Sequence, residues 1–179
     1  MPITKLGFTS RLRAEALAPN AQTAVISITD PGTPEATLAS GFRDVLRLAF
    51  FDAVPADEYL PAPLPGLFDH RMARQIGDFV GQLQAAADDI AVIVHCEYGV
   101  SRSAAVALFI EAYAAAALEA REFAYDANQW VVDQLSRLHP DLYIEIPSVA
   151  EVEERRGEFR APLIPGANGD TSRAVDLGQ

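Results

Sequence analysis

Residues 90–103 have the sequence IAVIVHCEYGVSRS, and residues 104–118 continue it as AAVALFIEAYAAAAL. The first five residues are too few and too β-branched for a helix, so they predict a central strand covered on both faces. The run 104–118 is apolar nearly all round, which predicts a buried helix packed on the sheet. A strand, a tight loop and a helix therefore follow one another in this part of the chain.

Two further strands are predicted on the N-terminal side. Residues 22–29 form a short apolar run that ends at the turn signal Asp30-Pro31-Gly32, and residues 44–51 combine alternating polarity with aromatic side chains. The segment 53–65 contains four prolines, which exclude regular structure there. Loops of this length in compact domains are often functional.

Helices are predicted between and after these strands. Residues 66–86 place apolar side chains on one helical stripe, with Asp69 as a cap near the start. A second stripe covers 127–138, and a short acidic helix is expected over 148–156. Strands that alternate with helices predict an α/β fold, a three-layer sandwich with a mainly parallel central sheet flanked by helices.

The composition favours one globular domain. Of the 179 residues, 50% are hydrophobic, which supplies a sizeable core and excludes disorder over most of the length. We expect a single domain at 1–160 and a flexible tail at 161–179, where the sequence is polar and lacks periodicity. The N-terminus has no apolar run of signal-peptide length, and the run 104–118 is too short to span a bilayer. We therefore expect a cytoplasmic monomer without membrane contact.

The charge and the cysteine count exclude several kinds of site. There are 14 basic and 25 acidic residues, for a net charge of −11, which opposes binding to nucleic acid. The single cysteine can form neither an internal disulfide nor a multi-cysteine metal site.

That cysteine, Cys96, opens the loop after the predicted central strand, and Arg102 follows it with five residues between. The loop amides and the start of the next helix point at one place above the sheet, where they favour an anion. A guanidinium adds two parallel donors suited to phosphate oxygens, and Gly99 allows the backbone to curl. The same surroundings favour the thiolate, so the spacing predicts a phosphate-binding site with a cysteine nucleophile.

The stretch HCEYGVSRS, residues 95–103, resembles the signature of cysteine-dependent protein tyrosine phosphatases. Its fixed positions match the pattern His-Cys-x2-Gly-x-Ser-Arg-Ser of the small dual-specificity-like branch. A weaker resemblance covers about residues 20–150, and Phe50-Phe51-Asp52 is similar to the aromatic-x-Asp triplet of small bacterial members. The resemblance implies a phosphotyrosine protein phosphatase-like fold.

The same resemblance implies a role for each residue of the loop. Cys96 would form a phosphocysteine intermediate, Ser103 would assist the departure of its sulfur, and His95 would support the loop. Phosphate would bind to the loop amides and to the guanidinium. The residues concerned are Glu97, Tyr98, Gly99, Val100, Ser101 and Arg102. No metal and no cofactor is expected.

The general acid is predicted to be Asp52, because it lies where a strand gives way to the long loop and because the triplet resembles that of the bacterial members. Asp57 and Asp69 are the alternatives, although Asp69 is more typical of a helix cap.

The expected substrate is a phosphorylated protein or a small phosphomonoester, in the manner of a protein-tyrosine or dual-specificity phosphatase. The loop contains Glu97 and no lysine, which disfavours polyphosphorylated rings. Two alternatives stay open: an inositol-polyphosphate phosphatase, which can carry Glu at this position, and a non-catalytic phosphate-binding pseudophosphatase.

Overall fold

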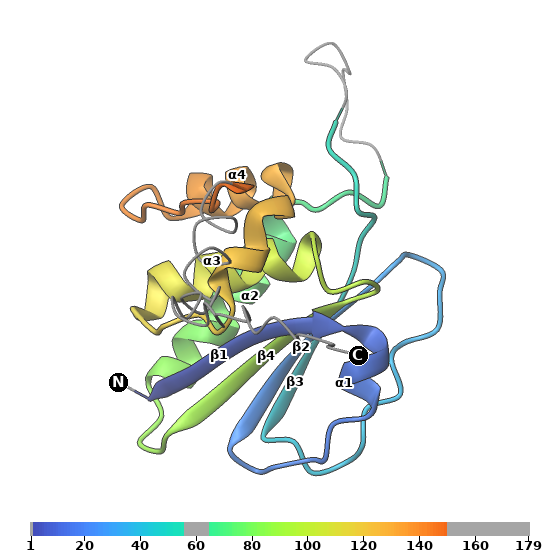
Figure 1. Ribbon diagram of the computed structural model, residues 1–179, viewed down its shortest axis with the longest axis vertical. Helices are drawn as coiled ribbons and strands as arrows, with labels where there is room; N and C mark the ends of the chain where they lie inside the picture. The colour runs from blue at the N-terminus through green and yellow to red at the C-terminus, as the bar shows by residue number, and fades with distance from the viewer. Residues whose placement is uncertain (1, 56–64, 150–179) are drawn as a thin grey trace, which may run out of the picture.

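The computed structural model describes residues 2–55 and 65–149, and their central feature is a parallel sheet of four strands (Figure 1). The strands are β1 (Ile3–Ser10), β2 (Thr23–Thr29), β3 (Asp44–Ala49) and β4 (Ile90–Cys96). Their order across the sheet is β1-β4-β2-β3, and all three neighbouring pairs are parallel. The carboxyl ends of all four strands therefore meet at one edge.

Helices cover both faces of the sheet, which confirms the predicted α/β fold class. The helices α2 (His70–Gln84), α3 (Arg102–Ala114) and α4 (Gln129–Leu138) lie together on one face (Figure 1). The short helix α1 (Arg11–Glu15) lies on the opposite face, against β1 and β4. A 3₁₀ helix, η1 (Arg121–Asp126), connects α3 to α4.

The central strand and the buried helix agree with their sequence pattern. Val92 and Val94 of β4 are fully buried, and α3 is buried nearly all round. The helix is shorter at its C-terminal end than the predicted 104–118, because Ala115 adopts a left-handed conformation with φ of 51° and ends it. The chain then returns to the sheet, where Leu118 forms a bridge with Leu6.

The first strand and the two shortest helices are not predicted by the sequence. β1 is at the edge of the four-stranded sheet, and the strand it pairs with is β4, more than eighty positions away in the chain. α1 has five residues and η1 has six, too few for a periodic pattern. β3 ends at Ala49 instead of residue 51, because the amide of Phe51 leaves the sheet and donates to the carbonyl of Gly66.

Several predictions fall on parts of the chain that the structure does not describe. The expected tail at 161–179 and nearly all of the expected helix at 148–156 lie outside the described residues, and so does Asp57. The domain boundary at 160 therefore stays a prediction.

The expected helix at 66–86 is α2, and it begins directly after Asp69. The carboxylate of Asp69 accepts a hydrogen bond from the amide of Met72 at 2.9 Å, which is the geometry of an N-cap. The structure thus gives Asp69 the capping role that its sequence position indicates.

We predict that Asp69→Ala lowers the free energy of unfolding by about 1 kcal/mol, because it leaves a helix-end amide without an acceptor. Urea denaturation of the purified protein measures this. Asp69→Asn keeps a capping oxygen and should stay close to the parent, as should Asp78→Ala on the exposed face of the same helix. Equal stability of the two Asp69 variants would contradict the capping role.

Candidate active site

The loop between β4 and α3 forms a tight arc at the carboxyl edge of the sheet. Gly99, in the middle of the arc, has φ of +73°, and a Cβ at this position would overlap the backbone of Thr9 and Ser10 at the end of β1. Only glycine fits both the conformation and the space. The close contact with the end of β1 therefore restricts the conformation of the loop at Gly99.

The thiol of Cys96 lies inside this arc and is only 2% exposed. The amide of Gly99 donates a hydrogen bond to its sulfur at 3.3 Å, and Ser103 Oγ lies 3.2 Å from the same sulfur. The thiol also sits next to the N-terminal end of the thirteen-residue helix α3. The amide of Gly99 and the N-terminal end of α3 are therefore both directed at the place where the sulfur lies.

The guanidinium of Arg102 is buried at the start of α3. Its Nη1 donates to Asp30 Oδ1 at 2.6 Å and to the carbonyl of Phe50 at 2.6 Å. Its Nε is also buried but has no hydrogen-bond partner within the described part of the chain. Nη1 of the guanidinium is thus held by two protein acceptors, whereas Nε makes no hydrogen bond within the described residues.

Asp52 lies next to this guanidinium. Its Oδ1 accepts hydrogen bonds from Ser101 Oγ at 2.7 Å and from Asn128 Nδ2 at 2.8 Å, and its Oδ2 is 4.0 Å from Arg102 Nε. The structure therefore brings the predicted acid to the predicted phosphate loop. Of the two alternatives, Asp69 caps α2 and Asp57 is not described.

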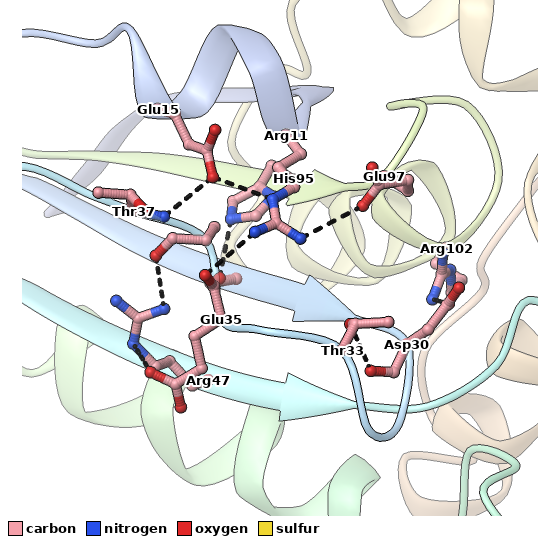
Figure 2. Close-up of polar contacts among 12 residues, drawn as sticks. Arg11, Glu15, Asp30, Thr33, Glu35, Thr37, Arg47, His95, Glu97 and Arg102 are labelled. Atoms are coloured by element: carbon pink, nitrogen blue, oxygen red, sulfur yellow. Dashed lines mark hydrogen bonds and ion pairs between the residues drawn. The ribbon is translucent and has the colours of Figure 1, made fainter.

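Two residues of the site are missed by the sequence analysis. Asp30, interpreted there only as part of a turn signal, forms the ion pair with Arg102 (Figure 2). Asn128 caps α4 through its Oδ1, which accepts from the amide of Val131, and it uses its Nδ2 to bind Asp52. A signal for Asp30 was present, because it follows a strand of a parallel sheet and such strands place their carboxyl ends at one edge.

His95 points to the other face of the sheet from Cys96, since side chains alternate along a strand (Figure 2). It is fully buried, and its Nε2 forms a hydrogen bond with Ser27 Oγ of the neighbouring strand at 2.8 Å. Burial lowers the pKa of His95 from its usual 6.5 to about 4, so the ring is neutral near pH 7.

The remaining loop residues face outward. Glu97 is exposed, and its carboxylate lies 3.7 Å from Arg11 Nη1 of α1, while its carbonyl accepts from the amide of Arg11 (Figure 2). Tyr98 and Val100 are exposed at the rim. The negative side chain that follows Cys96 is thus paired with the guanidinium of Arg11 on α1.

Comparison with known proteins adds little evidence on function to the geometry of the site. No family model matches the chain, and no curated protein matches it either. One solved structure that resembles it is that of human tyrosine phosphatase-like serine/threonine/tyrosine-interacting protein. The two are 17% identical over 79% of this chain and 80% of that chain, with a TM-score of 0.36. This similarity is too low to support a function, so the functional argument depends on the site itself.

Two searches of the described residues were negative. They contain no group of three or more His, Cys, Asp or Glu side chains placed to hold a metal ion. No helix within the same ranges is long and apolar enough to cross a membrane.

We predict that His95 makes the protein less stable in mild acid. The folded protein keeps the ring neutral down to about pH 4, whereas the unfolded chain protonates it near pH 6.5, so a falling pH favours the unfolded state. The contribution of His95 is therefore complete above about pH 6.5 and is lost as the pH falls towards 4. Between pH 7 and pH 5 the loss should be about 2 kcal/mol.

Urea denaturation at both pH values measures this loss. His95→Asn removes the titrating ring and should reduce the difference between the two pH values, and the same substitution at exposed His70 is the matched control. A His95→Asn protein with the full pH dependence would show that other groups cause it. Keeping the pH at 5 or above limits the contribution of Glu15, whose pKa is lowered by hydrogen bonds from the Thr37 amide and from Arg11.

Proposed function

We propose that this protein is a phosphomonoester hydrolase that uses Cys96 as its nucleophile, in the manner of a protein-tyrosine or dual-specificity phosphatase. The observation that supports the proposal most directly is the burial and hydrogen bonding of the Arg102 guanidinium. A buried guanidinium whose Nε makes no hydrogen bond within the described residues, at the end of the loop that begins with a thiol accepting an amide hydrogen bond, fits an anion that is to be attacked by sulfur.

In the first step the sulfur of Cys96 attacks phosphorus in line with the leaving group. A sulfur–phosphorus bond forms, the bond from phosphorus to the substrate oxygen breaks, and that oxygen takes a proton from the carboxyl group of Asp52. The loop amides and Arg102 bind the non-bridging oxygens, where negative charge is held in the transition state.

In the second step a water molecule attacks the phosphocysteine. Asp52, now a carboxylate, takes the proton from water, the sulfur–phosphorus bond breaks, and inorganic phosphate leaves. Ser103 Oγ, 3.2 Å from the sulfur, can donate a hydrogen bond to the departing thiolate. As written, these two reaction steps require no metal ion or other cofactor.

The surroundings of Arg102 favour a phosphoprotein over a polyphosphorylated ring. Asp30 and Asp52 both lie beside the guanidinium. Carboxylates at these positions repel additional phosphate groups on a substrate. Exposed apolar side chains lie around the same edge and suit an aromatic or peptide substrate. They are Phe51, Val54, Tyr98 and Val100.

The first test is turnover of a small aryl phosphate such as p-nitrophenyl phosphate. We predict that Cys96→Ser lowers kcat by at least roughly 10⁴-fold, because a serine hydroxyl is not ionised in this site. Binding of inorganic phosphate to the same variant, followed by calorimetry, should persist. A wild-type protein that binds phosphate through Arg102 without any turnover would instead be a non-catalytic phosphate-binding module.

The second test separates the two carboxylates beside Arg102. We predict that Asp52→Asn lowers kcat for a phosphotyrosyl peptide by roughly 10²- to 10⁴-fold and removes the decline of kcat at high pH, because the proton donor is lost. Asp30→Asn should change mainly KM and keep that decline, because Asp30 orients the guanidinium. The reverse pattern would assign the proton transfer to Asp30.

A further inference from the structure

A hollow lies on the β1 side of the proposed phosphate loop. Its volume is about 460 Å³, and it lies between the end of β1, the start of α1, the loop and η1. Tyr98 and Gly99 of the loop form one wall, so the hollow adjoins the proposed phosphate site. A volume of this size lies within the range of protein ligand sites, which is roughly 300–1,000 Å³.

The side chains that line this hollow combine aromatic rings with a positive charge. Tyr98 is 81% exposed and Phe123 is 45% exposed, while Phe8 is half-buried. Arg13, on α1, is exposed and is the charged residue among those that line the hollow. Exposed aromatic rings beside a cation are typical of surfaces that bind protein segments.

The neighbouring Arg11 differs from Arg13 in how its charge is used. Its Nε pairs with Glu15 at 2.9 Å, its Nη1 lies 3.7 Å from Glu97, and its Nη2 donates to the carbonyl of Glu35 (Figure 2). Arg11 is therefore neutralised within the fold, and it lies outside the hollow. The positive charge presented to a partner on this side of the loop is that of Arg13.

We propose that this hollow binds the residues that flank the phosphorylated side chain of a protein substrate. An apolar side chain of the substrate packs between Tyr98 and Phe123, and a neighbouring carboxylate pairs with Arg13. The inference rests on the proposed phosphatase function, since a substrate chain anchored in the phosphate loop is carried past Tyr98 into the hollow. It also identifies the preferred substrates as phosphopeptides with apolar and acidic neighbours.

The test compares phosphotyrosyl peptides with a small aryl phosphate. The parent peptide carries a leucine and two glutamates next to the phosphotyrosine. In a second peptide lysines replace the two glutamates, and in a third alanine replaces the leucine. Each peptide is made in two forms, with these residues either N-terminal or C-terminal to the phosphotyrosine. Wild-type kcat/KM should be about fivefold higher with the acidic flank, the range that an exposed ion pair allows. It should fall by about tenfold when the leucine is removed.

Variants of the hollow should change these ratios without changing turnover of p-nitrophenyl phosphate. Arg13→Glu should reverse the preference for the acidic flank, Arg13→Gln should abolish it, and Phe123→Ser should reduce the dependence on leucine. The controls are Arg74→Glu, an exposed arginine on α2, and Tyr143→Ser, an exposed aromatic residue outside the hollow. Thermal unfolding of each variant checks that it is folded.

Each outcome assigns the failure to one proposal. If p-nitrophenyl phosphate is hydrolysed but the flanks or the Arg13 variants make no difference, the hollow is not a substrate site and the phosphatase function stands. If no phosphate ester is hydrolysed, the proposed function is wrong, and anisotropy of the labelled peptides with wild-type protein then tests the hollow directly. Binding that is insensitive to Arg13→Glu and Phe123→Ser would overturn the inference.

Discussion

The ion pair between Arg102 and Asp30 is the contact on which the geometry of the carboxyl edge depends. A guanidinium that is almost fully buried is costly unless it is paired and hydrogen-bonded, and Asp30 and the carbonyl of Phe50 both accept hydrogen bonds from its Nη1. Asp30 follows β2, Phe50 follows β3, and Arg102 begins the helix after β4. One buried charge therefore connects the segments that follow three strands, including the segment after β3 that carries Asp52.

The two faces of the sheet contribute to the site in different ways. On the face covered by α2, α3 and α4, Cys96 at the end of β4 is part of the apolar core and lies beside the N-terminal end of α3. On the α1 side, the neutral ring of His95 is bonded to Ser27, and Arg11 pairs with Glu97 of the loop (Figure 2). Contacts on both faces thus hold the same loop, and the amide of Gly99 is directed at the sulfur of Cys96.

The sequence predicts the part of the site that is local and misses the part that depends on topology. The strand, loop and helix around Cys96 follow from consecutive residues, and so does the cap at Asp69. Strand β1 is missed because its stability comes from a partner distant in the chain. Asp30 and Asn128 are missed because their partners, Arg102 and Asp52, meet them only after the sheet has formed. Local patterns cannot specify such pairs.

The net charge of −11 is compatible with the proposed anion site because the two act over different distances. Carboxylates on the surface act through water and are screened over about 8 Å at physiological ionic strength. The amide of Gly99 and the guanidinium of Arg102 act at hydrogen-bond distance on their partners, where screening is weak. Under the proposed function, the overall charge would slow the approach of anionic substrates, while the loop would set the affinity for one phosphate group. The exposed cation of Arg13 beside the loop would offset part of that repulsion.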